Sequence, residues 1–371
     1  MFILTHRQSV TGTRDELKFT MAPGKVSKPS RTGPAPKLAK QSPKKLKKSV
    51  KVLSKDVNHS LCIPTTLLSH CKNLEQVTYT VYQVAKAATM FNVGEIVVLD
   101  LGTMTGSTKE KKLSDSMLIA SLLQYFVTPP YLVNTVFKQK YLCYFREAAK
   151  LPRLPSLPFM RYLQTDQGRY REGLAIRMSK PGIQGKKIKE FKQTKYVNVG
   201  KSEVLELKAQ LVPVNVRVTV DVIERKVVSP REAYGDFVGA QSSYGYHVRI
   251  AKNFGDVFME SALADGYSQA LWVNCDDYYY NEEKQRKILP FVDRIIRPEA
   301  ASQNVSNILL VFGKWKDVQK SFAASKDLFE GVEGAHQFFD GQMGLPAGVE
   351  GCIPIQDACM LSLVAAQNLA K

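Results

Sequence analysis

Two runs of consecutive apolar residues constrain the fold of this chain most strongly. Ile96–Leu99 lies in the stretch GEIVVLDL, and Ile308–Phe312 lies in NILLVFGK. A strand that is apolar on both faces suits a parallel sheet with helices packed against both sides. The first run follows a segment with apolar residues at helical spacing, namely Leu74, Val77, Val81, Val84, Ala85, Ala88 and Phe91. Because helix and strand alternate in this way, we expect an α/β fold.

The middle of the chain has a different pattern. From Arg171 onward, turn residues separate five short, β-branched segments: EGLAIRM, KYVNVG, EVLELKAQL, VRVTVDVIE and YGYHVRIA. This pattern predicts a small, OB-like β-barrel. We therefore expect an α/β domain over residues 56–164 and 252–371 that is interrupted by a barrel over residues 165–251. Such barrels bind single-stranded nucleic acid through aromatic side chains. The candidates for this contact are Tyr196, Tyr244, Tyr246 and Arg249. Packing inside the barrel is the alternative role.

Positive charge is concentrated at the N-terminus. Residues 1–55 hold 14 Lys and Arg against 2 Asp and Glu, and so contribute +12 to the formal net charge of +18. Their polar, Pro-rich composition predicts a disordered tail. A basic segment gains affinity for polyanions by releasing their counterions, so the tail either contacts nucleic acid or only aids solubility. The stretch Ser42–Lys48 (SPKKLKK) can act as a nuclear localisation patch, which predicts a nuclear or nucleolar protein, with the cytoplasm as the alternative.

The cysteine spacing argues against a metal-binding protein, and the hydropathy pattern argues against a membrane-spanning one. The six cysteines are scattered, and none forms a CxxC pair or a zinc-binding spacing. We therefore expect no metal site, and thiols that stay reduced. No apolar run reaches the roughly 18–20 residues of a membrane-spanning helix, so we expect no membrane partner.

Seven segments occur in a fixed order and cover most of residues 60–371. They are VYQVAKAATMFNVGEIVVLD, LLQYFVTPPYL, REG at Arg171–Gly173, GYHVRIA, DGY at Asp265–Tyr267, LLVFG at Leu309–Gly313, and DACMLSLVAAQ at the end. As an ordered set they resemble the SPOUT-class, or α/β-knot, RNA methyltransferases, in the subgroup with an inserted OB-like barrel. The resemblance implies that the C-terminal segment forms a deep trefoil knot, one of the rare exceptions to the rule against knots.

The resemblance also implies a site for S-adenosylmethionine in the loops after the last strands. In this family, backbone groups hold the adenine, and glycines allow the close approach that this requires. Carried over to this chain, the cofactor-binding positions are Phe312, Gly313, Gly341, Gln342, Gly344, Leu345, Ile353 and Ile355. An ordinary turn at the end of a strand would also explain each position taken alone.

Two polar stretches depart from the family's pattern. Relatives carry an Arg-Thr-Glu-Glu-like stretch before the last helix, where this chain reads PIQD at Pro354–Asp357. They also carry a Gly-Thr-Ser-Glu-Arg-like stretch after the first strand of the knot domain, where this chain reads VNCDDYYY at Val273–Tyr280. Either the substrate differs, or catalysis is weakened or lost.

Two functions are consistent with these features. As an enzyme, the chain would transfer a methyl group from S-adenosylmethionine to a base in structured RNA, and the resemblance implies a uridine of ribosomal RNA. The N3 of uridine must lose a proton. Asp276, Asp277 and Asp357 are candidates for the base, and exposed, solvated aspartates are the alternative. Arg171 could position a phosphate or a base, or form a structural salt bridge. As a binding module, the chain would hold RNA during ribosome assembly without efficient methyl transfer. The resemblance also implies a homodimer, although the last helix could equally complete the core of a monomer.

Overall fold

The computed structural model describes residues 56–102, 113–160, 168–177, 191–235, 238, 245–261, 263, 265–278, 289–296, 305–347 and 351–370. The predicted basic tail, residues 1–55, lies outside the described residues. In the described part of the chain, no helix is long and apolar enough to cross a membrane.

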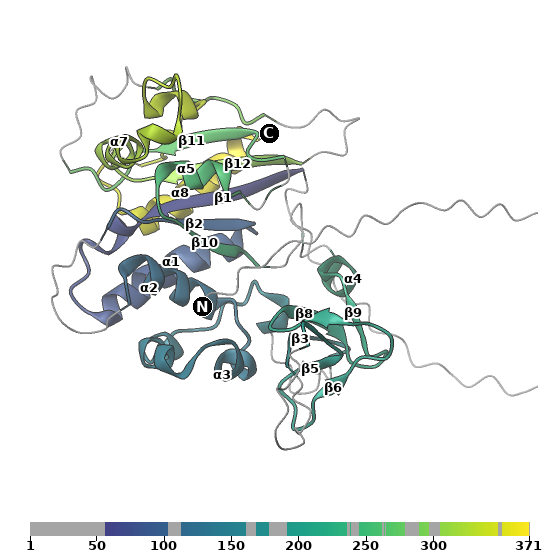
Figure 1. Cartoon of the computed structure of the whole chain (residues 1–371). Helices are drawn as coiled ribbons and strands as arrows, with labels where there is room; N and C mark the ends of the chain where they lie inside the picture. Colours follow the sequence, from purple (N-terminus) through teal and green to yellow (C-terminus); the bar gives the residue numbers. More distant parts are fainter. Residues whose placement is uncertain are drawn as a thin grey trace, which may run out of the picture. The chain divides into compact units, whose positions relative to one another are not determined.

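A six-stranded parallel sheet forms the centre of the α/β part (Figure 1), in the order β10-β2-β1-β12-β11-β13. Its strands are β1 (Val57–Pro64), β2 (Glu95–Leu99), β10 (His247–Ala251), β11 (Gln269–Val273), β12 (Ser306–Phe312) and β13 (Gly341–Gln342). The two apolar runs of the sequence form β2 and β12, which lie on either side of β1. The prediction of an α/β fold with a parallel sheet is therefore confirmed.

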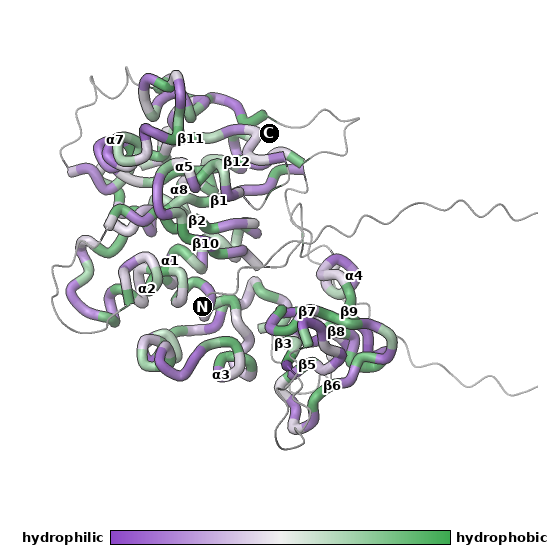
Figure 2. The backbone as a smooth tube through the Cα atoms, in the orientation of Figure 1, coloured by the Kyte–Doolittle hydropathy of each residue, from purple (hydrophilic) through white to green (hydrophobic). Residues whose placement is uncertain are grey.

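Helices cover both faces of this sheet, as Figure 1 shows. The helices α1 (Leu74–Met90), α2 (Asp115–Phe126) and α8 (Ile355–Leu369) share one hydrophobic cluster with strand residues such as Leu61 and Ile63. The helices α5 (Phe254–Met259) and α7 (Trp315–Ala324) share a second cluster with Cys62 on the opposite face. In Figure 2, hydrophobic residues are frequent along the central strands and the helices beside them. This two-sided burial explains why β2 and β12 carry consecutive apolar residues.

Polar side chains fix the start of three of these helices. The side chain of Asn73 accepts a hydrogen bond from the Gln76 N–H at the start of α1. Ser114 caps α2 and Asn253 caps α5 in the same way. Each cap satisfies one of the N–H groups that have no partner within the helix, which typically contributes about 1 kcal/mol. Pro354 precedes α8 and provides no side-chain cap.

A second, antiparallel sheet lies between β2 and β10 in the sequence, in the order β6-β5-β3-β8-β9. Its strands are β3 (Tyr170–Ala175), β5 (Tyr196–Asn198), β6 (Leu205–Glu206), β8 (Arg217–Asp221) and β9 (Lys226–Val228), and β4 (Gln193–Thr194) pairs separately with β7 (Val212–Pro213). The Lys208 N–H donates to the Arg225 carbonyl over 3.0 Å, which brings the chain after β6 close to the β9 edge. The short helices α3 (Val133–Val136) and α4 (Pro230–Tyr234) flank this part of the chain in the sequence.

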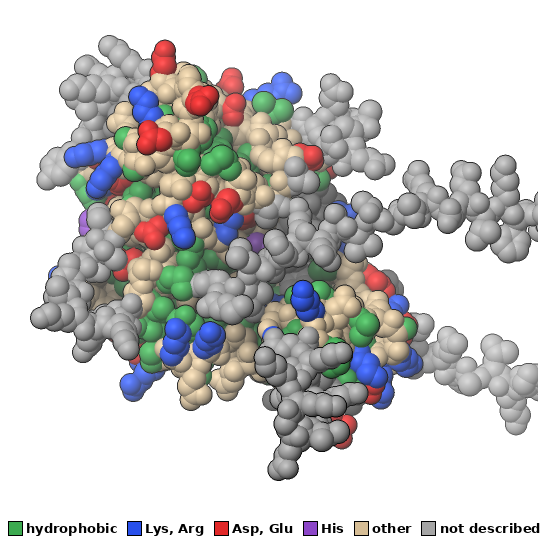
Figure 3. All heavy atoms as spheres, viewed as in Figure 1, with side chains coloured by type: hydrophobic (Ala, Val, Ile, Leu, Met, Phe, Trp, Pro, Cys, Tyr) green, Lys and Arg blue, Asp and Glu red, His purple; other side chains and the backbone are tan. Residues whose placement is uncertain are grey.

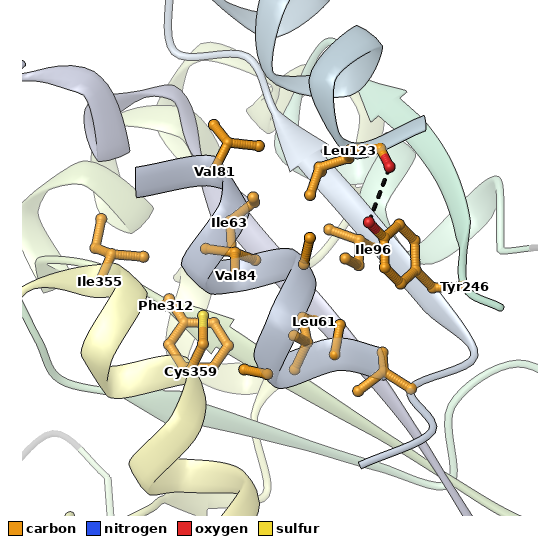
Figure 4. Close-up of a cluster of buried hydrophobic side chains, with 14 of the residues drawn as sticks. Leu61, Ile63, Val81, Val84, Ile96, Leu123, Tyr246, Phe312, Ile355 and Cys359 are labelled. Atoms are coloured by element: carbon orange, nitrogen blue, oxygen red, sulfur yellow. Dashed lines mark hydrogen bonds between the residues drawn. The ribbon is translucent and has the colours of Figure 1, made fainter. Parts of the chain in front are cut away.

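The prediction that YGYHVRIA is a barrel strand is wrong. Its last five residues, His247–Ala251, form β10, which pairs in parallel with β2 at the edge of the main sheet. The Tyr246 hydroxyl donates to the Leu123 carbonyl over 2.8 Å inside the core of the α/β part (Figure 4). Arg249 donates to Glu95 over 2.8 Å in a largely buried ion pair. Both candidates therefore serve the main sheet, whereas Tyr196 lies on β5 and Tyr244 lies outside the described residues.

Candidate functional site

The carboxyl ends of the six parallel strands lie along one edge of the main sheet. From β1 the chain continues to β2 and β10 on one side, and it later builds β11, β12 and β13 on the other side. The order therefore reverses between β1 and β12. Ligands of open α/β sheets bind outside the carboxyl ends of the strands at such a switch point. The candidate site therefore lies in the loops that follow β1, β11, β12 and β13.

Gly313 follows the last residue of β12 at this edge and makes two hydrogen bonds. Its N–H donates to the Cys275 Sγ over 3.2 Å, and its carbonyl accepts from the Trp272 Nε1 over 2.9 Å. Its φ is +115°, and an added Cβ would lie 3.1 Å from the Pro64 Cγ. The backbone therefore requires glycine here, because side chains rarely adopt this conformation. The neighbouring Phe312 is 1% exposed, and Figure 4 shows its ring inside the core.

The chain after β13 lines a small pocket. The pocket has a volume of about 20 Å³ and is lined by Asn274, Phe291, Gln342, Met343, Gly344, Leu345 and Gly351. Three of the predicted cofactor positions therefore meet here, and the half-exposed Phe291, which sequence reasoning missed, lies beside them. Gly344 is exposed, and an added Cβ would meet only the Phe291 ring, at 3.6 Å.

Gly341 and Gln342 have structural partners in the same region. The Gln342 side chain donates from Nε2 to the Leu289 carbonyl over 2.6 Å, and its backbone N–H donates to the Pro290 carbonyl over 2.8 Å. An added Cβ on Gly341 would lie 2.6 Å from the Pro290 oxygen. Both residues thus hold the segment around Pro290 against β13. This structural role alone explains why a glycine and a glutamine stand at these positions.

The segment before α8 lies against the loop after β11. The Asp276 N–H donates to the Ile353 carbonyl over 2.7 Å, and the Asp277 N–H donates to the Gly351 carbonyl over 2.6 Å. Ile355 is 2% exposed and points into the core beside Phe312 (Figure 4), and Ile353 is also buried. Asp357 is exposed in the first turn of α8. A carboxylate there interacts favourably with the helix dipole, which accounts for Asp357 without a catalytic role.

Asp276 is the predicted catalytic residue with the most unusual environment. Its side chain is 3% exposed, and its Oδ1 lies 3.1 Å from the His70 Nε2. Burial raises the pKa of its carboxyl, and the nearby His70 and Lys314 oppose this rise. Its φ of +61° places a non-glycine residue in the left-handed region, where aspartate is tolerated better than most side chains.

His70 is the partner that sequence reasoning missed. It follows the 3-10 turn Thr65–Leu68 directly after β1, and its side chain is 58% exposed. Its ring meets the Tyr278 ring edge-on, with centroids 5.7 Å apart. The available signal was its place in the sequence, since a polar residue soon after a parallel strand lies at the ligand-binding edge.

Arg171 is not joined to these loops by any contact that the described residues make. It lies on β3 of the antiparallel sheet, with its guanidinium 4.7 Å from the centre of the Tyr131 ring. The Tyr131 hydroxyl donates to the Glu172 carbonyl over 3.1 Å. Arg171 therefore takes part in the contact between the antiparallel sheet and the segment after α2.

A larger hollow lies elsewhere on the molecule. It has a volume of about 520 Å³, runs along α7, and is lined by Trp315, Gln319, Phe322, Ala323, Lys326, Glu333, Gly334, Ala335 and His336. It shares no residue with the loops after β11 and β13, so we assign the candidate site to the strand ends. Among the described residues, no three His, Cys, Asp or Glu side chains gather to hold a metal ion.

Comparison with known proteins identifies the family. Residues 58–366 match the family described as "Putative RNA methyltransferase". A protein of Saccharomyces cerevisiae named as a putative methyltransferase is 50% identical over 300 residues, which cover 79% of this chain and 89% of the yeast protein. A second one from the same yeast is 40% identical over 347 residues, covering 91% of this chain and 96% of that protein. The Drosophila melanogaster "28S rRNA (uridine-N(3))-methyltransferase" is 28% identical over 333 residues, 83% of this chain and 61% of that enzyme. The chain therefore belongs to this family of RNA methyltransferases.

Proposed function

We propose that this protein methylates the N3 atom of a uridine in ribosomal RNA, with S-adenosylmethionine as the methyl donor. One observation carries the proposal. The loops after β11 and β13 and the segment before α8 meet at the ligand-binding edge of the sheet. They do so in a chain that belongs to an RNA methyltransferase family. The choice of base and atom follows the fly relative and a human relative with the same printed name.

The residues around the small pocket suit the methyl donor in their chemistry. Phe291 and Leu345 offer apolar surface for a purine, and the exposed Gly344 leaves its backbone groups accessible. The volume of about 20 Å³ accommodates about one water molecule. Binding of a nucleoside-sized molecule therefore requires these loops to separate. We place the cofactor among Gly313, Gly341, Gln342, Gly344, Leu345 and Ile353, with Phe312 and Ile355 supporting it from the core.

We also propose the finer features of the fold. The segment Gly351–Ile353 bonds to the loop after β11 and then leads into α8, which supports a trefoil knot at this point. The bond between Lys208 and Arg225 supports closure of the antiparallel sheet into an OB-like barrel. We propose the division into a tail over residues 1–55, an α/β domain over 56–164 and 252–371, and an insert over 165–251, except that β10 belongs to the α/β domain.

The proposed partners are ribosomal RNA and a second copy of this chain in a homodimer. On the face that Figure 3 shows, Lys and Arg side chains lie over the antiparallel sheet and the α3 region, where they can contact phosphates. The basic tail would add to this affinity, and its Lys-rich stretch supports a nuclear or nucleolar location.

The experiment is a methyl-transfer assay. Ribosomal RNA from cells that lack the protein is incubated with it and with methyl-labelled S-adenosylmethionine, and the digested nucleosides are identified by mass spectrometry. Labelled 3-methyluridine supports the proposal. A protein that binds this RNA, but neither binds the donor in a calorimetric titration nor transfers the label, would instead be the RNA-binding module.

One pair of variants locates the cofactor. Gly344→Leu fills the pocket without a close contact to the backbone, whereas Ala347→Leu adds the same side chain at an exposed position outside the lining of the pocket. We expect Gly344→Leu to weaken donor binding at least about tenfold, a change of about 1.4 kcal/mol, and Ala347→Leu to bind normally. Equal affinities would place the donor elsewhere.

A further inference from the structure

A histidine–aspartate pair connects the end of the first strand to the candidate site. The His70 Nε2 lies 3.1 Å from the Asp276 Oδ1, although 206 positions separate the two residues in the sequence. The imidazole is 58% exposed and the carboxylate is 3% exposed. We propose that His70 is the general base that removes the proton from the acceptor nitrogen, and that Asp276 is its positioning residue. This inference rests on the function proposed above.

The backbone holds Asp276 toward His70. The residue has a φ of +61°, and its own N–H and that of Asp277 donate to the carbonyls of Ile353 and Gly351. Aspartate tolerates this conformation better than most residues, and the two hydrogen bonds to the segment before α8 hold it there. The same bonds connect the pair to the small pocket proposed for the cofactor, because Gly351 also lines that pocket.

Charges of both signs surround the pair, while burial raises the pKa of the Asp276 carboxyl. Lys314, at the start of α7, and His70 both counter the effect of burial on Asp276, whereas the neighbouring Asp277 and Asp317 in the first turn of α7 add negative charge. When this carboxylate is ionised it only accepts hydrogen bonds, so in the neutral imidazole the His70 Nε2 carries the proton and Nδ1 keeps its lone pair. Within the described part of the chain, Nδ1 has no hydrogen-bond partner.

The proposed step is a proton transfer coupled to methyl transfer. The His70 Nδ1 takes the N3 proton of the uridine, and the electron pair left on N3 forms the new bond to the methyl carbon. The bond between this carbon and the sulfonium sulfur breaks, and its electron pair remains on sulfur. Asp276 stabilises the resulting imidazolium. Because the His70 side chain is half-exposed, the imidazolium can release the proton to water. This is the arrangement in which a carboxylate orients a histidine base and stabilises its charged form.

A purely structural role is the alternative, since the bond also joins the turn after β1 to the loop after β11. The structural role and the role as general base predict different rates for a His70 variant when the acidity of the uridine N3–H changes. A missing base matters less when N3–H ionises more readily, whereas a misplaced loop impairs the reaction equally at every acidity.

The experiment compares His70→Gln and Asp276→Asn with the exposed control His336→Gln in the full-length protein. Single-turnover methylation of an rRNA fragment is measured from neutral to mildly alkaline pH, and also with 5-fluorouridine, whose N3–H is more acidic, at the target position. We expect His70→Gln to lower the rate at neutral pH by about 10²–10⁴-fold, with unchanged donor affinity. We expect this defect to shrink at higher pH and with 5-fluorouridine, and the control to behave as wild type.

The possible failures are distinguishable. A wild-type protein that binds the donor but forms no 3-methyluridine overturns the proposed function and the base with it. An active wild type together with a fully active His70→Gln, or with a defect of constant size at all pH values and with both nucleosides, overturns only the base. Non-additive effects of His70→Gln and Asp276→Asn in the double variant would confirm that the two act as one unit.

Discussion

Replacing Gly313 by alanine tests the geometry of the strand end that faces the candidate cofactor site. The φ of Gly313 is +115°, beyond the left-handed region that L-residues occasionally adopt. The added Cβ would lie 3.1 Å from the Cγ of Pro64, which ends β1. The methyl group therefore meets a rigid ring, and either the ring or the backbone of Gly313 must shift.

The cost has two parts. A residue held in such a backbone region costs about 1–3 kcal/mol, and the tight contact with Pro64 adds about 1 kcal/mol, the lower end of the range for overpacking. The expected fall in the free energy of unfolding is therefore about 2–4 kcal/mol. With an unfolding entropy of about 2 cal/mol/K per residue, this corresponds to a fall of roughly 3–6 °C in the melting temperature of the folded part.

The assay is urea unfolding followed by circular dichroism, with Gly331→Ala as the matched control. Gly331 also has a positive φ, +77°, but an added Cβ there would have no atom within 4 Å. Its expected loss is about 1–2 kcal/mol, from the left-handed backbone alone. If the two variants lose equal stability, the close approach of Gly313 to Pro64 does not exist in the folded protein, and the reasoning is refuted.

Two other predictions concern the antiparallel sheet and the cysteines. Glu172→Ala removes a fully buried carboxylate that accepts a 2.9 Å hydrogen bond from Arg217 Nε. We expect urea unfolding to show a loss of about 3–5 kcal/mol in the free energy of unfolding. A loss below about 1 kcal/mol would mean that this pair is open to water. Cys143 is exposed, whereas burial raises the pKa of Cys62 to about 12 and that of Cys359 well above its usual value. Because the thiolate is the reactive form, iodoacetamide should label Cys143 first in the native protein, and mass spectrometry after a short pulse would contradict this if Cys62 or Cys359 were labelled equally.

The central strands could be predicted from the sequence because burial on both faces leaves a local signal. Ile96–Leu99 and Ile308–Phe312 are consecutive apolar residues, and both form strands beside β1. The strand over His247–Ala251 was assigned to the wrong sheet for the opposite reason. It lies at the edge of the main sheet and is only partly buried, so its alternation of polar and apolar residues resembles that of an antiparallel strand. Pattern alone does not determine which sheet an alternating strand joins.

The orientation of single side chains was predictable only in part. The alternation along β12 places Ile308, Leu310 and Phe312 on the same face, and all three belong to the core cluster that contains α1 and α8. A strand end near a cofactor therefore does not imply that its last side chain points toward the cofactor. The backbone of Gly313, rather than the ring of Phe312, is the part of this strand that reaches the edge.

The His70–Asp276 pair shows why the chemistry of the site was the hardest part to predict. Its two residues are separated by 206 positions and meet only because β1 and β11 flank β12 in one parallel sheet. Sequence reasoning reached Asp276 through its loop, where it looked like an exposed aspartate, yet its partner and its burial arise from strand order and from the segment at Gly351–Ile353. A fold that brings the ends of distant strands together needs no local motif for its catalytic groups. The departure of this loop from the polar stretch that the resemblance implies is therefore compatible with an active enzyme, provided that the base comes from the loop after β1.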